Sequence, residues 1–201
     1  MTKRSSLLTI GMFLACMCLA TISQAGVIFQ DDFNSENGGK YFLNYNNFAN
    51  WTVSNGTVDI IGEKNYWDYF PTYGLYVDLD GSTSSAGTLT TKDSFAAGSY
   101  MLQFDLAGSQ RDGINGDYSN TVDIYLGSWH TSVTRYSADP MATFTFTFST
   151  DGGALVFHNQ GGDNVGAILD NVEVSSVPIP GTLMLLGSSL LGLAGIRRRM
   201  K

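Results

Sequence analysis

Residues 100–106 read Tyr-Met-Leu-Gln-Phe-Asp-Leu, with a large apolar side chain at every second position. Because successive side chains of a β-strand point to opposite faces of its sheet, one set can enter a core while the other faces outward. A period of two recurs at residues 51–53, 58–60, 75–79, 122–126, 144–148, 155–157 and 168–174. Residues 26–176 contain no long stretch with the 3.6-residue period of a helix. We therefore expect an all-β domain, an antiparallel β-sandwich of seven or eight short strands.

The segments between these stretches are rich in Gly, Asn, Asp and Ser. Asn55-Gly56 is a strong turn signal because both residues tolerate the positive φ of tight hairpin turns. We expect it to join strands 51–53 and 58–60 as a β-hairpin. Residues 175–180 read as a short linker that follows the domain.

Charge is distributed unevenly along the 201 residues. The whole chain carries a net charge of −7, but all 18 acidic residues lie between Asp31 and Glu173. Only five basic residues accompany them, so this segment carries −13. Such a surface repels phosphate backbones, which argues against nucleic-acid binding. It also attracts cations, Ca²⁺ among them.

The first 25 residues have the three parts of a secretory signal peptide. Basic residues at positions 3 and 4 precede an apolar run over residues 7–20, and Ser23-Gln24-Ala25 follows with small residues at both ends. We expect cleavage after Ala25 and export of the remainder. A buried N-terminal helix and a lipoprotein signal ending at Cys16 are the alternatives.

The last 25 residues combine a Pro-x-Pro motif, an apolar segment and a basic end. Pro178 and Pro180 precede the uncharged residues 181–196, which are followed by Arg197, Arg198 and Arg199. A helix over 181–196 spans about 24 Å, somewhat less than the roughly 30 Å hydrocarbon core of a bilayer. Counting from Val177 brings the stretch to about twenty residues, a marginal span. Arginines stay on the cytoplasmic side, so we expect the domain over 26–176 outside the inner membrane.

The tail over residues 177–201 resembles the PEP-CTERM sorting tail, which has these three elements in the same order at the C-terminus. The resemblance implies recognition by an exosortase, a membrane transpeptidase-like enzyme of Gram-negative bacteria that make extracellular polysaccharide. The chain would pass from an inner-membrane anchored intermediate to the cell surface or extracellular matrix. Ile179 stands where the family usually has Glu. An ordinary C-terminal anchor that is never cut is the alternative.

Four segments of the domain resemble jelly-roll domains of the galactose-binding-like type. They are Asp31-Asp32-Phe33-Asn34 and residues 74–82, 98–108 and 167–174. The resemblance implies a jelly-roll sandwich of the kind common among non-catalytic carbohydrate-binding modules.

Asp170 is the most informative polar residue of the domain. In a regular strand it shares a face with Ile168, Val172 and Val174, which form the apolar side. A carboxylate that faces a core is costly unless it is paired, hydrogen-bonded or bound to a metal. The alternative is that Asp170 ends the strand and caps a turn with Asn171.

In the family resembled, an aspartate at this place binds a structural Ca²⁺ together with residues of the first strand. That resemblance implies Asp170 as a ligand, with Asp31, Asp32 or Asn34 beside it. Ca²⁺ accepts such a mixture of carboxylate and carbonyl oxygens. The segment 78–82 lacks the third acid and the final glutamate of a calcium-binding EF-hand loop, so we expect its two aspartates to lie on a solvated edge.

Exposed aromatic side chains are a common means of binding sugars, because a flat ring packs on the apolar face of a pyranose. The densest aromatic cluster is Tyr66-Trp67-Asp68-Tyr69-Phe70, in which Asp68 can accept hydrogen bonds from sugar hydroxyls. Trp129 beside His130 is a second candidate. We expect ligand binding by Tyr66, Trp67, Asp68, Tyr69 and Trp129. The alternative is that these rings fill the core of the sandwich.

The chain has no recognisable catalytic motif. It lacks a Gly-x-Ser-x-Gly elbow, a paired-histidine zinc motif and a phosphate-binding glycine loop. Its three glutamates form no Glu-x-Asp pair of the kind that jelly-roll glycosidases use. Both cysteines, Cys16 and Cys18, lie in the signal segment. We therefore expect no enzymatic activity, and a structural, partnered role for His158.

The sequence thus predicts an exported, non-catalytic envelope or extracellular-matrix protein that associates with polysaccharide. Its expected partners are the inner membrane, an exosortase and extracellular polysaccharide, and its one expected cofactor is a structural Ca²⁺. A structural surface protein that binds no sugar is the alternative.

Overall fold

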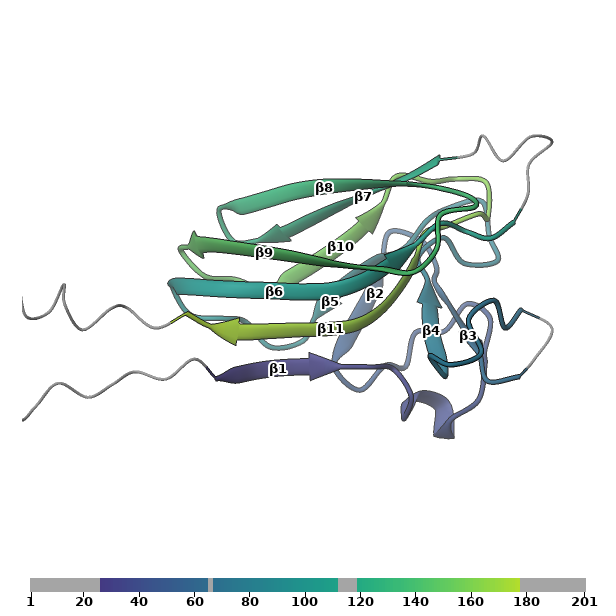
Figure 1. Ribbon diagram of the computed structural model, residues 1–201, viewed down its shortest axis with the longest axis horizontal. Helices are drawn as coiled ribbons and strands as arrows, with labels where there is room; N and C mark the ends of the chain where they lie inside the picture. Colours follow the sequence, from purple (N-terminus) through teal and green to yellow (C-terminus); the bar gives the residue numbers. More distant parts are fainter. Residues whose placement is uncertain (1–25, 65–66, 112–118, 178–201) are drawn as a thin grey trace, which may run out of the picture. The chain divides into compact units, whose positions relative to one another are not determined.

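The computed structural model describes residues 26–64, 67–111 and 119–177, which contain eleven strands and one short 3₁₀ helix (Figure 1). The elements are β1 (Val27–Asp31), η1 (Glu36–Gly38), β2 (Trp51–Ser54), β3 (Asp59–Gly62), β4 (Leu75–Asp78), β5 (Thr88–Thr91), β6 (Gly98–Ala107), β7 (Ser119–Leu126), β8 (Trp129–Tyr136), β9 (Ala142–Thr150), β10 (Leu155–Asn159) and β11 (Ile168–Ser176). The predicted signal peptide, Tyr66, and the tail motif with Pro178, Pro180 and the three arginines lie outside the described residues.

The strands form two antiparallel sheets. The six-stranded sheet has the order β3-β4-β11-β6-β9, with β1 also paired to β11, and the five-stranded sheet has the order β2-β5-β10-β7-β8. The chain alternates between the sheets from β4 to β7, and the strands β4-β11-β6-β9 lie opposite β5-β10-β7-β8, as Figure 1 shows. This is the strand order of a jelly roll built from two Greek keys. The all-β antiparallel sandwich predicted from the sequence is confirmed.

The main core lies between the two sheets because each strand turns alternate side chains inward. Phe157 of β10 packs against Phe104 of β6, with 5.2 Å between the ring centroids, and against Trp51 of β2 at 6.0 Å. These three side chains are almost completely buried. Each such burial contributes about 1.5–3 kcal/mol, so the aromatic contacts hold the sheets face to face.

A smaller apolar cluster lies on the outer face of the six-stranded sheet. Tyr76 of β4, Ala107 of β6 and Ile168 of β11 are fully buried there. Aromatic residues of the loop over 67–73, together with Met141, cover them. This loop therefore folds as a cap on the sheet.

The turn at Asn55-Gly56 joins the two sheets and forms no hairpin. Asn55 has the expected positive φ, 62°. However, β2 pairs with β5 whereas β3 pairs with β4. The predicted hairpin is wrong because the chain after the turn bonds instead to the segment before β5: the Thr57 N–H donates to the Ser85 carbonyl, and the Thr57 carbonyl accepts from the N–H groups of Gly81 and Gly87.

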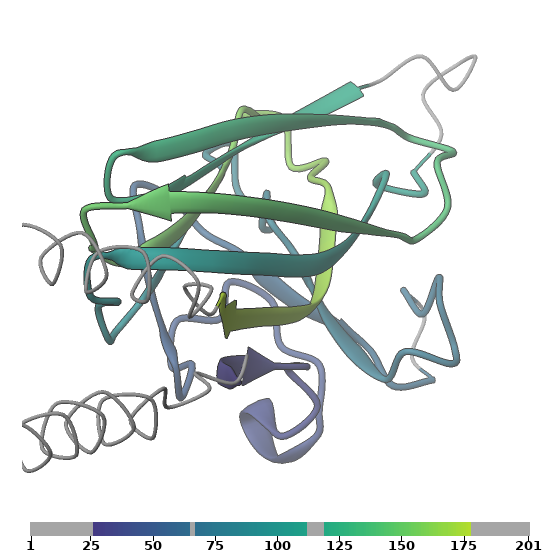
Figure 2. The ribbon, with the colours of Figure 1, turned by 60° about the vertical axis from the view of Figure 1, so that its left-hand side comes forward.

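A β-bulge interrupts β11. Its pairing with β6 runs from Asp170 opposite Asp105 to Glu173 opposite Gln103, so residues 171 and 172 together face one residue of β6. Asn171 has a φ of 48°. A bulge bends its strand, and β11 bends along its length in Figure 2.

The bulge also changes which face each side chain of β11 occupies. Leu169, Val172 and Val174 belong to the main core, whereas Ile168 belongs to the outer cluster. Asp170 alternates with Leu169 and therefore lies on the outer side, yet it is fully buried. The prediction that Asp170 shares a face with Val172 and Val174 is wrong, because the extra residue at the bulge shifts the period of two.

Residues Gly26–Ser176 form one compact unit. Its two ends lie side by side, since Val27 of β1 pairs with Ser175 of β11. The described residues contain no helix that is long and apolar enough to span a bilayer.

Candidate functional site

Two carboxylates are directly opposite each other where β6 pairs with β11. Asp105 accepts hydrogen bonds from the Thr143 hydroxyl at 2.5 Å and the Asn171 side-chain amide at 2.9 Å. Asp170 accepts one from the backbone N–H of Asn171 at 2.7 Å through Oδ1. Like charges at opposing strand positions are destabilising, so this pair needs a proton or a cation.

The second oxygen of Asp170 has no protein partner. Oδ2 is buried and accepts no hydrogen bond. Burial, together with the negative charges of Asp105, Asp32 and Asp31, raises the pKa of Asp170 to about 8. A buried carboxylate with an orphaned oxygen among other acids is the arrangement that a bound cation would satisfy.

The structure brings two of the residues predicted as partners of Asp170, namely Asp31 and Asp32, close to it. Asp31 already accepts hydrogen bonds on both oxygens, from the Phe33 N–H at 2.9 Å and from the Trp51 indole at 2.9 Å. Asp32 is exposed, and one of its oxygens accepts the Asn34 N–H at 3.1 Å. Asn34 itself uses Oδ1 to accept the Leu75 N–H at 2.8 Å. Asp32 is thus the least committed of the three predicted ligands.

A cavity of about 380 Å³ opens beside these acids, lined by Gln30, Asp31, Asp32, Ser35, Asn50, Asn171, Val172 and Glu173. Its oxygen-rich lining suits a hard cation such as Ca²⁺. Among the described residues, no group of three or more His, Cys, Asp or Glu side chains could hold a metal ion. A cation here would therefore draw on backbone carbonyls or water in addition to carboxylates.

Asp78 and Asp80 form a second buried acidic group. Asp78 accepts from the Arg111 guanidinium, and burial raises its pKa to about 7 against the attraction of that charge. Asp80 accepts from the backbone N–H of Gly162 at 2.9 Å, while its other oxygen has no partner. The expectation of a solvated edge is wrong, because the loop over 160–166 folds over both aspartates.

The predicted aromatic cluster folds around the hydroxyl of Tyr76. That hydroxyl accepts the Tyr69 N–H at 2.6 Å and donates to the Trp67 carbonyl at 3.2 Å. Asp68 accepts the Lys64 N–H at 2.8 Å. Trp67 and Tyr69 are partly buried against the outer apolar cluster. This segment therefore covers the cluster and still leaves part of both side chains exposed to solvent.

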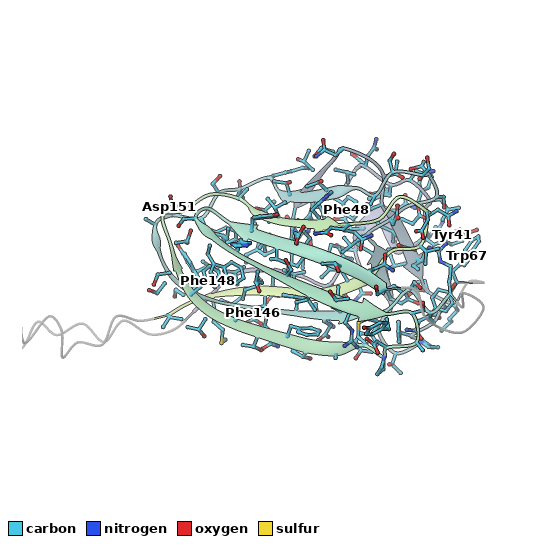
Figure 3. The ribbon with its side chains drawn as sticks, turned by 90° about the horizontal axis from the view of Figure 1, so that it is seen from above. Tyr41, Phe48, Trp67, Phe146, Phe148 and Asp151 are labelled. Atoms are coloured by element: carbon cyan, nitrogen blue, oxygen red, sulfur yellow. The ribbon has the colours of Figure 1, made fainter. Side chains whose placement is uncertain are left out.

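Trp129 lies elsewhere, at the start of β8. Its ring stacks on Phe148 with 3.8 Å between centroids and 10° between planes. It also lies 5.8 Å from Phe146 and packs against the main core. Figure 3 shows Phe146 and Phe148 well apart from Trp67. The structure therefore does not bring Trp129 and Trp67 into one site.

The outward side chains of the five-stranded sheet form a surface that the sequence reasoning missed. We call it the polar face: Thr52 and Ser54 of β2, Thr88 and Thr90 of β5, Val156 and His158 of β10, Ser119, Thr121, Asp123 and Tyr125 of β7, and His130, Ser132, Thr134 and Tyr136 of β8. The large apolar residues that alternate with them, such as Leu89, Ile124 and Phe157, enter the main core. A rigid sheet thus presents hydroxyls, imidazoles and two tyrosine rings.

Asp123 of β7 lies on the polar face next to the edge strand β8 and is held by hydrogen bonds. It accepts hydrogen bonds from the Ser132 hydroxyl at 2.5 Å and the Gln160 amide at 2.6 Å. These two bonds lower its pKa, and the nearby His158 and His130 act in the same direction. In the same row the Thr88 hydroxyl lies 3.0 Å from His158 Nδ1, as expected for a partnered histidine.

Two exposed tyrosines lie on either side of Asp123. Tyr125 is 38% exposed and stacks on His130, with 5.9 Å between centroids and 16° between planes. Tyr136 is 58% exposed at the other end of the β7–β8 pair. Aromatic rings and a fixed hydrogen-bonding group on one rigid surface are the elements that bind a polar, ring-shaped ligand.

No protein-family model matches the chain, and no curated protein matches it. Solved structures match its fold. The K3 cleaved adhesin domain of Lys-gingipain from Porphyromonas gingivalis W83 aligns with a TM-score of 0.51 at 14% identity, over 77% of this chain and 100% of that one. The K1 cleaved adhesin domain aligns with 0.51 at 12% identity, over 77% and 99%. The CBM22-1 xylan-binding domain from Paenibacillus barcinonensis aligns with 0.48 at 11% identity, over 79% and 99%. The chain therefore has the two-sheet fold of these adhesin domains.

Proposed function

We propose that this chain is an exported, non-catalytic module that associates with polysaccharide through the polar face. The observation that carries the proposal is the Asp123 carboxylate, fixed by Ser132 and Gln160 between the exposed rings of Tyr125 and Tyr136. The likeness to the adhesin domains concerns the fold alone. The surface residues support the binding role.

The composition of the polar face favours a neutral sugar chain. Asp123 is the one carboxylate among the outward side chains of its five strands, and none of them is Lys or Arg. Hydroxyls of a sugar can donate hydrogen bonds to Asp123, while the tyrosine rings pack on the apolar faces of the sugar. Adjacent strands lie about 4.8 Å apart, so the five-strand width accommodates several sugar rings in a row.

A single carboxylate also argues against glycoside hydrolysis at this face. The usual mechanisms need two carboxyl groups separated by roughly 5–10 Å, one as an acid and one as a nucleophile or base. Asp123 has no second acid beside it on these strands. The polar face supports binding without bond cleavage.

Binding of purified residues 26–176 to immobilised xylan, galactan, β-glucan and alginate tests this proposal. We expect Tyr125→Ala and Tyr136→Ala each to weaken binding about tenfold, a loss of about 1.4 kcal/mol, and Asp123→Asn to weaken it further. Thr145→Ala, an exposed change on the outer face of the other sheet, is the control and leaves binding unchanged. Absence of binding to every polymer favours the alternative, a structural surface protein.

The two ends of the chain support export and sorting as part of the same proposal. The predicted signal peptide precedes the domain, and the Pro178-x-Pro180 motif, apolar segment and arginines follow it. An exosortase would then release the domain from the inner membrane to the cell surface or matrix. The intact mass of the secreted protein tests both ends at once. A mass equal to that of the full chain contradicts both processing steps.

A structural Ca²⁺ is proposed, held by Asp170 and Asp32, at the acidic cluster that these two residues form with Asp31 and Asp105. The buried orphan oxygen of Asp170 supports it. The ion would neutralise the repulsion between Asp170 and Asp105 and connect β11 to the chain that follows β1.

A further inference from the structure

We propose that two copies of the domain associate through the outer edge of β9, so that their six-stranded sheets join into one continuous antiparallel sheet. The proposal goes beyond polysaccharide binding because it concerns an interaction of the chain with itself. It assigns a role to a strand that contributes no side chain to the polar face.

The backbone of β9 has hydrogen-bonding groups to offer. β9 is the last strand of the six-stranded sheet and pairs with β6 alone. In an antiparallel strand, every second residue turns its N–H and C=O groups away from the neighbouring strand. Within the described ranges, no backbone hydrogen bond from outside the β6–β9 ladder reaches residues 142–149. A row of donors and acceptors therefore faces outward, and another strand can pair with it.

β9 also lacks the features by which natural edge strands avoid such pairing, namely short length, charge, proline and bulges. Residues 142–150 read Ala-Thr-Phe-Thr-Phe-Thr-Phe-Ser-Thr, and they pair with β6 in one unbroken register. The other edge strands differ from it. β1, β2 and β3 have five residues or fewer, and β8 carries His130 and Arg135. In the described sandwich, β9 is thus the long and uncharged edge.

The sequence of β9 is complementary to itself when read in the opposite direction. In a pair of β9 strands centred on Phe146, Phe144 of one copy lies opposite Phe148 of the other. Thr145 then lies opposite Thr147. Aromatic pairs and threonine pairs at opposing positions stabilise antiparallel strands. This match of rings with rings and hydroxyls with hydroxyls identifies a second copy of the chain as the partner.

Pairing would also cover core residues that reach solvent at this edge. Phe144 and Phe146 pack against the main core, and their ring centroids lie 5.7 and 6.0 Å from that of Phe104. Both remain partly exposed, whereas Phe104 is fully buried. Arg135 lies 5.6 Å from the Phe144 ring and pairs with Asp139, so its charge is already compensated. A neighbouring sheet would remove the remaining apolar surface from water.

The association is closed at two copies. Both copies use the same edge, so a two-fold axis relates them and leaves no β9 edge for a third copy. For antiparallel strands this axis stands perpendicular to the sheet, which keeps equivalent faces on the same side. The two polar faces then point in the same direction. If the proposed function holds, both can bind one polysaccharide, with a higher apparent affinity than either face alone.

Sedimentation equilibrium of residues 26–176 at micromolar concentration tests the association. We expect wild-type protein to form a dimer. Each copy is strongly acidic, and salt screens the repulsion between the copies. The dimer should therefore become tighter as NaCl is raised from about 20 mM to about 300 mM.

Charge substitution on β9 separates specific pairing from non-specific association. Thr145 and Thr147 are exposed, so Thr145→Lys/Thr147→Lys and Thr145→Glu/Thr147→Glu are expected to fold, which thermal unfolding verifies. Like charges then oppose each other across the two-fold axis, and each variant alone should dimerise about tenfold more weakly or worse. An equimolar mixture places lysine opposite glutamate and should restore the dimer. Thr52→Lys/Ser54→Lys, at exposed positions of the edge strand β2, is the control and should remain dimeric.

The outcomes separate this inference from the proposed function. Wild-type protein that stays monomeric at every salt concentration overturns the inference. A dimer that survives both charge variants overturns it too, as does a mixture of the folded variants that stays monomeric. These results leave the proposed function standing, because the polar face of a single copy suffices for binding. A dimer that is restored in the mixture but binds none of the polymers supports the inference and contradicts the proposed function.

Discussion

The indole of Trp129 lies flat on the ring of Phe148, with 3.8 Å between centroids and 10° between planes. The two residues belong to β8 and β9, which lie in different sheets and are edge strands of those sheets. The stack therefore closes one side of the sandwich. A ring with one face covered in this way contributes mainly to the stability of the core.

Trp129→Ala should therefore lower stability and leave polysaccharide binding unchanged at temperatures where the protein is folded. Removing a large, packed aromatic side chain costs about 3 kcal/mol. Urea unfolding measures the loss, with Trp129→Phe as a milder change and the exposed Tyr136→Ala as the control for stability. Unchanged stability together with lost binding would contradict this and indicate that Trp129 belongs to the ligand site.

Calcium should stabilise the domain at the acidic cluster. A ligand that binds only the native state at a hundredfold excess over its Kd adds about 2.7 kcal/mol. For a domain of this size the melting temperature then rises by roughly 5–10 °C. Thermal unfolding with Ca²⁺ or EGTA measures the shift. Asp170→Asn should abolish it, and Asp163→Asn, an exposed acid on another loop, should not. Equal wild-type midpoints in Ca²⁺ and EGTA reject the site.

The buried Asp78 predicts that stability falls as the pH rises. Burial raises its pKa from 3.8 to about 7. Between those values the unfolded chain has lost a proton that the native protein keeps, so the free energy of unfolding decreases with pH. The stabilisation is fully present below about pH 4 and lost above about pH 7, with an upper limit of about 4 kcal/mol.

Urea unfolding in EGTA from pH 4.5 to 8 tests this dependence. Asp78→Asn resembles the protonated acid and should flatten the curve. Asp170, whose pKa is raised to about 8, acts in the same direction and is present in both proteins. Superimposable pH profiles of wild type and variant would exclude Asp78 as the cause.

Periodicity was sufficient to predict the sandwich but not all of its strands. The apolar alternation in β6, β7 and β9 is long enough to identify a strand from sequence. β5 and β8 have few large inward side chains, chiefly Leu89 in β5 and Trp129 and Val133 in β8, so their sequences resemble polar loops. They are strands because they complete the five-stranded sheet, which is a tertiary effect.

The site was harder to predict because it depends on register. Asp123 is unremarkable in sequence, and its neighbours Ser132 and His158 come from two other strands. Only the alignment of three strands brings them into one row. The signal that the sequence offered was the position of its two histidines, His130 and His158. Each lies next to a residue that enters or packs against the core, so each points outward from the sheet. The pairing of Asp170 with Asp105 likewise depends on a bulge that no local pattern predicts.

The crossing turn at Asn55-Gly56 yields a prediction about backbone contact. A Cβ added at Gly56 would lie 2.3 Å from the backbone carbonyl oxygens of Ser85 and Ala86. Backbone atoms cannot move aside as a flexible side chain can, so Gly56→Ala forces the turn away from the segment that precedes β5. We expect a loss of about 2 kcal/mol or more. Gly26→Ala, which meets nothing within 4 Å, should be neutral in the same urea titration. Equal stability of the two variants would mean that the connection between β2 and β3 does not approach the backbone of Ser85 and Ala86 so closely.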